Sequence, residues 1–199
     1  YFFFKYLLKI SLTFSETIIF QNNDDKKYFD LNILNKEALV VPGSGVNLRL
    51  YNQVMLPKKI TFMMISRMIK NKGIENFFYV ADKISKINKK IQFVFVGNYQ
   101  NKFSLNKNFS SLKREFKNVK ILKWSKNGKH LYKNCSVYVL PSKREGMSRT
   151  ILEAMSSGRA IITTNVPGCK ETVKNGHNGF LINYNDNLSL FKAISKFVE

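Results

Sequence analysis

The sequence predicts an α/β protein built on a Rossmann-like open parallel sheet. From residue 60 onward, short apolar runs alternate with amphipathic stretches, which is the pattern of βαβ units. The apolar runs are continuous, as in strands that helices cover on both faces of a sheet. Turn-forming residues such as Gly97, Pro141 and Gly158 end these segments.

Each element of this domain follows from its local pattern. Strands are expected at the apolar runs 60–66, 91–96, 119–122, 137–140, 160–164 and 180–182. Helices are expected where apolar residues recur at helical spacing, over 74–87, 105–116, 130–133, 149–156 and 188–198. Together these elements describe one open α/β domain.

The start of the chain is expected to belong to a different unit. Its expected elements, a helix over 1–10, a strand over 17–20 and a helix over 24–31, are too few to enclose a core. We interpret 1–41 as the tail end of an N-terminal domain. Residues 42–57 contain Gly43 and Gly45 without clear periodicity, so we interpret them as the connection to a second domain over 58–199.

The chain is strongly basic, with 33 Lys+Arg against 13 Asp+Glu and a formal charge of +20. A hydrophobic fraction of 44% excludes disorder as the main description. The positive charge suits an anionic lipid surface or a nucleic acid. However, Lys, Asn and Ile are abundant along the whole chain, as an AT-rich coding sequence would also produce. All three interpretations stay open.

Two cysteines cannot make a disulfide framework, and no Cys/His group has zinc-ligand spacing, so we expect a reducing compartment and no structural metal. The longest apolar stretch, 1–20, contains Lys5, Lys9 and Glu16, so no transmembrane helix is expected. No signal peptide is expected either. Trp124 flanks a predicted strand and is expected to pack in the core.

The segment PSKREGMSRTILEAMSSG at 141–158 carries the most information about function. A predicted strand delivers the chain to a loop with Glu145 and Gly146, and Ser148 is placed to cap the next helix. Ligands of open α/β sheets bind at such carboxyl ends, where the N–H groups of a helix start suit a phosphate or a sugar hydroxyl. Glu145 and Glu153 could contact two groups of one elongated ligand, or be ordinary loop and helix-surface residues.

Two further segments bear on the same edge of the sheet. Arg67 and Lys72 follow the first strand of the domain, and an Arg fork with a Lys point charge suits a diphosphate, although two cations mean little in so basic a chain. The segment VPGSGVN at 41–47 has glycines on either side of Ser44, which permit tight turns. It lacks the remaining glycine of a dinucleotide fingerprint, and no P-loop motif is present.

In their order, these segments resemble the C-terminal half of a family 4 glycosyltransferase of the GT-B fold. That group comprises retaining, nucleotide-sugar-dependent enzymes, many of them in bacterial capsule, lipopolysaccharide and exopolysaccharide synthesis. The resemblance rests on VPGSGVN at 41–47, ISRMIKNKGI at 65–74, FVFVGN at 93–98, the segment 137–173 and NGHNGFLI at 175–182. Glu145 and Glu153 have the Glu, seven residues, Glu spacing that is typical of the family.

The resemblance implies roles for individual residues. Arg67 and Lys72 match the cationic pair that holds the donor diphosphate, and Glu145 matches the glutamate that contacts the donor sugar. These three residues are the ones expected to serve the chemical step. Glu153 matches the glutamate that binds the nucleotide ribose.

The resemblance also implies further donor-binding positions beside these four residues. The resemblance implies backbone donors at Gly146, Met147 and Ser148, places Leu152 near the nucleoside, and places Gly43, Ser44 and Gly45 near the diphosphate. No metal or other cofactor is expected, because cationic side chains and a helix N-terminus stabilise the leaving diphosphate in this group.

The function implied is a cytoplasmic hexosyltransferase at the inner face of the cell membrane, with peripheral membrane association. It would use a nucleotide-diphosphate sugar, UDP being the expected nucleotide, and a glycan or lipid-linked acceptor of cell-surface polysaccharide synthesis. The family's catalytic histidine lies in the N-terminal domain, and neither His130 nor His177 stands at its position, so we assign no general base. Without that domain as partner, the chain is expected to be weakly active or inactive.

Two alternatives to an active transferase stay open. One is a non-catalytic basic module that binds RNA or another polyanion, although nucleic acid is not the expected partner. The other is an inactive glycosyltransferase fragment.

Overall fold

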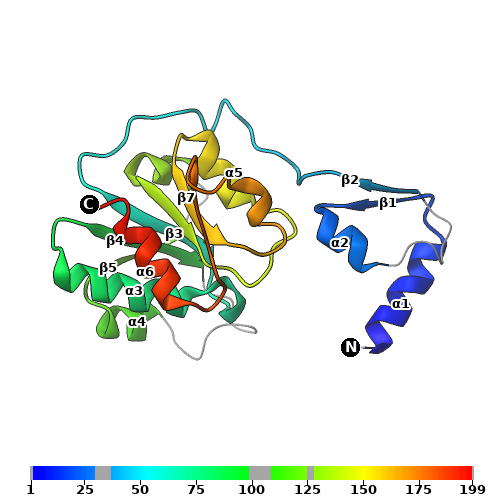
Figure 1. Cartoon of the computed structure of the whole chain (residues 1–199), viewed down its shortest axis with the longest axis horizontal. Coiled ribbons are helices and arrows are strands. Elements are labelled where there is room, and N and C mark those ends of the chain that lie inside the picture. The colour runs from blue at the N-terminus through cyan, green and yellow to red at the C-terminus, as the bar shows by residue number, and fades with distance from the viewer. Residues whose placement is uncertain (1, 30–36, 99–108, 125–127, 199) are drawn as a thin grey trace.

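The computed structural model describes residues 2–29, 37–98, 109–124 and 128–198. It contains a two-stranded parallel sheet near the N-terminus and a six-stranded parallel sheet in the rest of the chain (Figure 1). The small sheet joins β1 (Thr17–Phe20) to β2 (Glu37–Val40) and is accompanied by α1 (Phe2–Thr13) and α2 (Asn23–Tyr28). The predicted division into 1–41, 42–57 and 58–199 stays a prediction.

The six-stranded sheet confirms the predicted open parallel α/β fold. Its strands are β3 (Thr61–Arg67), β4 (Gln92–Asn98), β5 (Val119–Lys123), β6 (Val137–Leu140), β7 (Ala160–Thr164) and β8 (Gly179–Ile182). They lie in the order β5-β4-β3-β6-β7-β8, and every neighbouring pair is parallel. The order therefore reverses between β3 and β6, which makes their junction the topological switch point of the sheet.

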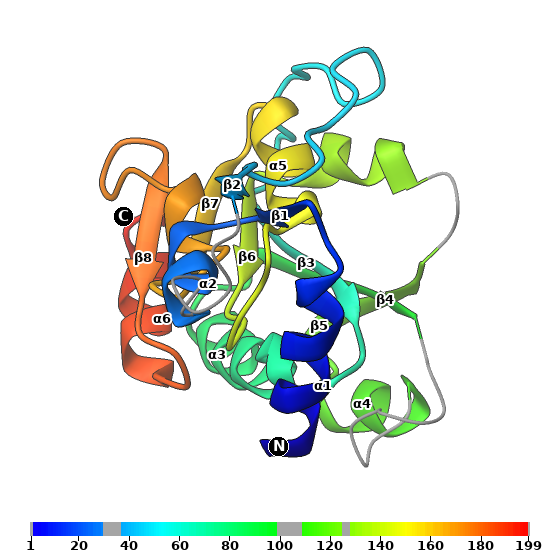
Figure 2. The same cartoon turned by 90° about the vertical axis from the view of Figure 1, so that its right-hand side faces the viewer.

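Helices cover both faces of this sheet (Figures 1 and 2). The helices are α3 (Ile74–Ile87), α4 (Phe109–Glu115), α5 (Arg149–Ser156) and α6 (Asn187–Ser195), with short 3-10 turns η2 (Lys70–Lys72), η3 (Gly128–Asn134) and η4 (Lys170–Thr172). Helices α3 and α6 contact each other over one face, and α5 packs on β6 and β7 over the other. This two-sided cover is why the strands read as continuous apolar runs.

The core is rich in aromatic side chains. Phe62 of β3 stacks on Phe93 of β4, with ring centroids 5.2 Å apart, and Phe77 of α3 meets Phe93 edge to face at 6.0 Å. All three side chains are fully buried. Burying each side chain stabilises the fold by about 1.5–3 kcal/mol relative to leaving it exposed. The apolar residues at helical spacing in α3 therefore form the face of the helix that packs in the core.

Two details differ from the sequence predictions. Strand β2 was not predicted, because it is short and its side chains are exposed or only half-buried. Ser148 does occupy the N-cap position of α5, but its side chain caps no backbone N–H; its hydroxyl lies 3.2 Å from the Thr150 hydroxyl instead. The first part of the helix predicted over 105–116 lies outside the described residues.

Arg159 fastens the connection between the two sheets to the C-terminal end of α5. Its side chain is buried and donates to the carbonyl oxygens of Cys135 at 2.8 Å and Ser157 at 2.8 Å. It also donates to the carbonyl oxygens of Val54 and Met55, which belong to the connection. The stretch around 51–55 is therefore attached to the C-terminal end of α5.

We predict that Arg159→Met lowers the free energy of unfolding by about 2–4 kcal/mol, because four carbonyl groups lose a charged donor in a buried setting. Urea unfolding followed by circular dichroism measures the loss. The matched control is Arg114→Met on the exposed surface of α4, which should change stability by no more than about 0.5 kcal/mol. Equal losses in the two variants would contradict the role given to Arg159.

Candidate functional site

The candidate site lies where the strand order reverses, at the carboxyl ends of β3 and β6. Only two residue pairs join these strands, Phe62 with Val137 and Met63 with Tyr138, although β3 continues to Arg67. Beyond Met63 the two strands are no longer paired, and this split between their carboxyl ends, called the crevice below, is the kind of place at which α/β sheets bind ligands.

Lys72 and Glu145 meet across this crevice. The Lys72 ammonium lies 2.5 Å from Oε1 and 2.7 Å from Oε2 of Glu145, and the two side chains are 15% and 13% exposed. Arg67, at the end of β3, is exposed, and within the described residues its guanidinium has no hydrogen-bond or ion-pair partner. The structure thus brings together two of the three predicted catalytic residues and leaves Arg67 open to a ligand.

The loop that carries Glu145 is held from two sides. The N–H of Lys143 donates to the Asn71 carbonyl at 2.8 Å, and the N–H of Glu145 donates to the Pro167 carbonyl at 3.1 Å. Gly168, with φ +77°, packs so closely that a Cβ there would collide with the backbone of Glu145 and Gly146. Neighbouring backbone therefore sets the position of this loop.

Unpaired backbone donors line the same loop. In the part of the chain that the structure describes, no acceptor meets the N–H of Gly146 or of Met147. These groups stand just before α5, whose first turn also presents unpaired N–H groups. A helix start preceded by free amides favours an anion such as a phosphate.

The connection between the sheets reaches this loop as well. A Cβ added to Gly43, where φ is +73°, would lie 2.6 Å from Cγ of Met147 and 3.9 Å from Cδ1 of Leu152. The structure therefore brings these three predicted donor-binding residues together. Ser44 is exposed, and a Cβ added to Gly45 would meet nothing within 4 Å.

Glu153 lies in a cavity of about 410 Å³ beside the loop. Its carboxylate is largely buried and accepts from the Tyr132 hydroxyl at 3.0 Å on Oε2 and from Nε of Arg149 at 3.1 Å on Oε1. Tyr51, Ile65 and Trp124 also line the cavity. An ordinary surface position for Glu153 is thereby excluded.

The aromatic lining of this cavity was not predicted. Trp124, expected to pack in the core, is 44% exposed and faces the cavity instead. The available signal was its position one residue after β5, at the carboxyl edge where ligands bind. Burial raises the pKa of Tyr132 far above its usual range, which keeps its hydroxyl protonated as a donor to Glu153.

Residues after β1 contact the Glu145 loop from the N-terminal side. The Asn22 side chain donates to the Gly146 carbonyl at 2.8 Å, and Asp25 pairs with Arg144. Asp24 pairs with Lys170 at 2.8 Å. These contacts join positions more than a hundred residues apart, so no local pattern could predict them.

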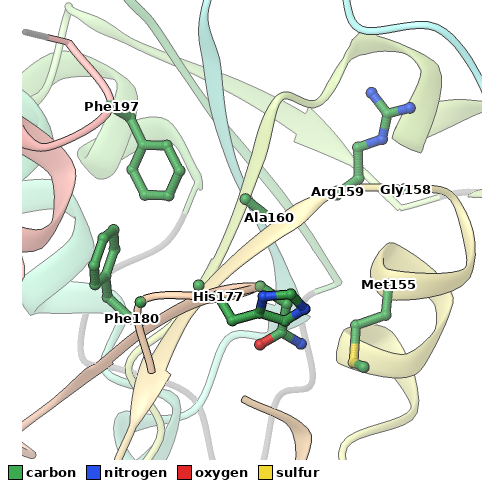
Figure 3. A pocket seen from close by; sticks show the side chains of 10 residues that line it. Met155, Gly158, Arg159, Ala160, His177, Phe180 and Phe197 are labelled. Atoms are coloured by element: carbon green, nitrogen blue, oxygen red, sulfur yellow. The ribbon is translucent and has the colours of Figure 1, made fainter. Parts of the chain in front are cut away.

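A larger cavity of about 490 Å³ lies at the opposite edge of the sheet, where β7 and β8 begin (Figure 3). Its lining includes Arg159 and His177. The Arg159 donors are committed to backbone carbonyls, and His177 is an exposed turn residue. The cavity therefore offers a ligand little charge, and the predicted residues are not there.

Neither a metal-ligand cluster nor a membrane-spanning helix occurs in the part of the chain that the structure describes. Over the described ranges, no three His, Cys, Asp or Glu side chains gather as metal ligands, and metal independence stays a prediction. No helix in those ranges has the length and apolar character needed to cross a membrane.

Sequence comparison identifies a matching family and individual relatives. The profile of the family described as "Glycosyl transferases group 1" matches residues 52–199. The N,N'-diacetylbacillosaminyl-diphospho-undecaprenol alpha-1,3-N-acetylgalactosaminyltransferase of Campylobacter jejuni is 27% identical over 97% of this chain and 54% of its own length. The UDP-Gal:alpha-D-GlcNAc-diphosphoundecaprenol alpha-1,3-galactosyltransferase of Escherichia coli is 29% identical over 98% of this chain and 54% of its own. The chain thus spans about half the length of these relatives.

Solved structures share the fold. Anabaena HepE, in complex with UDP and glucose, aligns with a TM-score of 0.78 at 17% identity, covering 98% of this chain and 57% of that chain. The C-terminal domain of the glycosyl transferase group 1 family protein LpcC from Francisella tularensis aligns with a TM-score of 0.66 at 20% identity, covering 77% and 88%. The six-stranded sheet and its helices therefore have the fold of a C-terminal GT-B domain.

We predict that Gly168→Ala lowers the free energy of unfolding by about 3 kcal/mol, since it adds a backbone collision to the strain of a positive φ. Gly176→Ala is the matched control, because Gly176 has φ +81° with nothing within 4 Å of an added Cβ. Gly176→Ala should lower the free energy of unfolding by only about 1 kcal/mol. Chemical denaturation of both variants measures the difference, and equal losses would show that Gly168 does not support the Glu145 loop.

Proposed function

The chain belongs to the glycosyl transferases group 1 family, and we propose that it binds the nucleotide-sugar donor of a retaining hexosyltransferase that builds lipid-linked or cell-surface glycans. The observation that carries this proposal is the meeting of Lys72, Glu145 and the free amides of Gly146 and Met147 at the switch point of the sheet. Cations, a carboxylate and N–H donors at one crevice match a ligand that joins a diphosphate to a sugar.

The proposed donor lies along the start of α5. Its diphosphate accepts from the amides of Gly146 and Met147, while Arg67 and Lys72 neutralise the charge that grows on the leaving diphosphate. An ammonium group has three donors, so Lys72 can hold Glu145 and a phosphate oxygen at once. Glu145 then accepts from sugar hydroxyls, which orients the sugar beside the bond that breaks.

The nucleoside end of the donor occupies the cavity around Glu153. Ribose hydroxyls donate to the Glu153 carboxylate, and the exposed face of Trp124 offers a surface for the base. We propose UDP as the nucleotide. The support comes from HepE, which was solved with UDP, and from the Escherichia coli relative, whose name specifies UDP-Gal.

The proposed acceptor is a sugar on undecaprenyl diphosphate or a related glycan. The names of both relatives specify diphosphoundecaprenol substrates, and a formal charge of +20 suits the anionic cytoplasmic face of a membrane. We further propose that the transfer needs no metal, with Arg67, Lys72 and the helix start in its place. No general base is assigned within this chain.

The test is calorimetric titration of the chain with UDP, GDP and single-stranded RNA at two salt concentrations. We expect one nucleotide to bind selectively, and Arg67→Ala and Glu153→Gln each to weaken it at least about tenfold, since each removes a charge-assisted hydrogen bond. The matched control is Glu75→Gln on the exposed surface of α3, which should bind like wild type.

A different result would favour the polyanion-binding alternative, for which the basic charge is the only support. Binding to RNA alone, falling steeply with salt and indifferent to Glu153→Gln, would replace the donor-binding proposal. Binding to none of the three ligands would leave the inactive fragment as the better description.

A further inference from the structure

The carboxylate of Glu153 is held asymmetrically. On the Oε2 side it accepts from the hydroxyl of Tyr132, a side chain only 1% exposed. On the Oε1 side it accepts from Arg149, whose side chain is 66% exposed. A buried ring has one orientation and an exposed arginine has many, so Tyr132 is the donor able to fix the carboxylate.

Tyr132 is itself packed from several sides. Its hydroxyl also lies 3.2 Å from the Thr150 carbonyl, on the first turn of α5. Its ring lies 6.1 Å from that of Tyr138 and meets the ring of Tyr51 edge to face, with centroids 5.8 Å apart and an interplanar angle of 74°. The ring therefore has little freedom to turn away from Glu153.

Tyr51 comes from a different part of the chain, the connection between the sheets. It is half-buried in the wall of the cavity that contains Glu153. Burial first, and then the charge of Glu153, raises the pKa of Tyr51. Two phenol groups, Tyr132 from η3 and Tyr51 from the connection, thus line the cavity that contains Glu153, and their rings contact each other.

The connection is fixed where it carries Tyr51. The Ser156 hydroxyl donates to the Tyr51 carbonyl, and the Val54 N–H donates to the Ser157 carbonyl at 3.4 Å. Arg159, which follows Gly158 at the start of β7 (Figure 3), holds the carbonyl of Val54. Glu153 and the anchors of Tyr51 therefore lie on α5 or directly after it, which keeps their spacing constant.

We propose that Tyr132 and Tyr51 are positioning residues that preorient the Glu153 carboxylate for a ribose hydroxyl. The inference rests on the proposed function, because it takes Glu153 as the ribose acceptor. A carboxylate whose orientation is already fixed gains more from a ligand hydroxyl than one that must be ordered on binding. The two tyrosines should therefore set how strongly the protein prefers a ribonucleotide to its deoxy form.

The test compares the affinities of UDP and GDP with those of their 2′-deoxy and 3′-deoxy forms by calorimetry. Wild type should bind the preferred ribonucleotide at least about tenfold more tightly than one of its deoxy forms. Tyr132→Phe should reduce that ratio to about threefold or less. Tyr51→Phe should reduce it by a smaller factor, and because Tyr51 is half-buried this variant should fold even if Tyr132→Phe does not.

Tyr138→Phe is the matched control. Its hydroxyl, like that of Tyr132, is buried and bonded, but to the Ile65 carbonyl at 2.9 Å and not to Glu153. This variant should lose comparable stability and keep the wild-type ribose preference. A merely structural effect of losing a buried hydroxyl would lower the ratio in both Tyr132→Phe and Tyr138→Phe, and would overturn the inference.

The outcomes separate this inference from the proposed function. If wild type binds neither UDP nor GDP, the proposed function fails and the inference fails with it. If wild type binds and discriminates, but folded Tyr132→Phe and Tyr51→Phe keep the full ratio, the inference alone is overturned.

Discussion

The pairing of β3 with β6 is the constraint on which the site depends. Because the strand order reverses at this pair, the chain leaves β3 toward α3 on one face and leaves β6 toward α5 on the other. The pairing stops at Met63 and Tyr138, and the loops that follow meet again at the Lys72–Glu145 ion pair. The crevice between these two contacts is the kind of place at which open parallel sheets bind ligands.

Helix α5 organises the rest of the site, although it is only eight residues long. The free amides of Gly146 and Met147 stand just before it, Glu153 in its middle lines the cavity of about 410 Å³, and its C-terminal end holds the connection through Ser156 and Arg159. These groups lie on α5 or directly beside its two ends, so the helix sets their spacing. A donor that spans diphosphate and ribose would meet both ends of that spacing at once.

The sequence predicted the succession of strands and helices along the large domain. It also led us to expect two glutamates and two cations at the carboxyl edge of the sheet. The predicted elements are confirmed because each depends on local periodicity. The places expected for the glutamates and cations follow from the rule that loops after parallel strands share an edge, and the roles of these residues stay predictions. The sequence missed β2, which has too little burial to leave an apolar pattern, and it assigned Trp124 to the core. A tryptophan one residue beyond a strand has the same sequence signature whether its ring packs inward or faces a ligand cavity.

The sequence by itself therefore determined the fold class, the family and the presence of Glu145 and Glu153 on either side of a helix start, since these are properties of neighbouring residues. Only the tertiary structure decided that Lys72 pairs with Glu145, that Tyr132 bonds to Glu153 in a cavity also lined by Tyr51, and that Arg159 holds the connection at Val54. Lys72 and Glu145 are 73 positions apart, Tyr132 and Glu153 are 21 apart, and Arg159 and Val54 are 105 apart. Contacts at such separations form only when the sheet brings its strand ends together, because chain entropy keeps the segments apart until the core is packed.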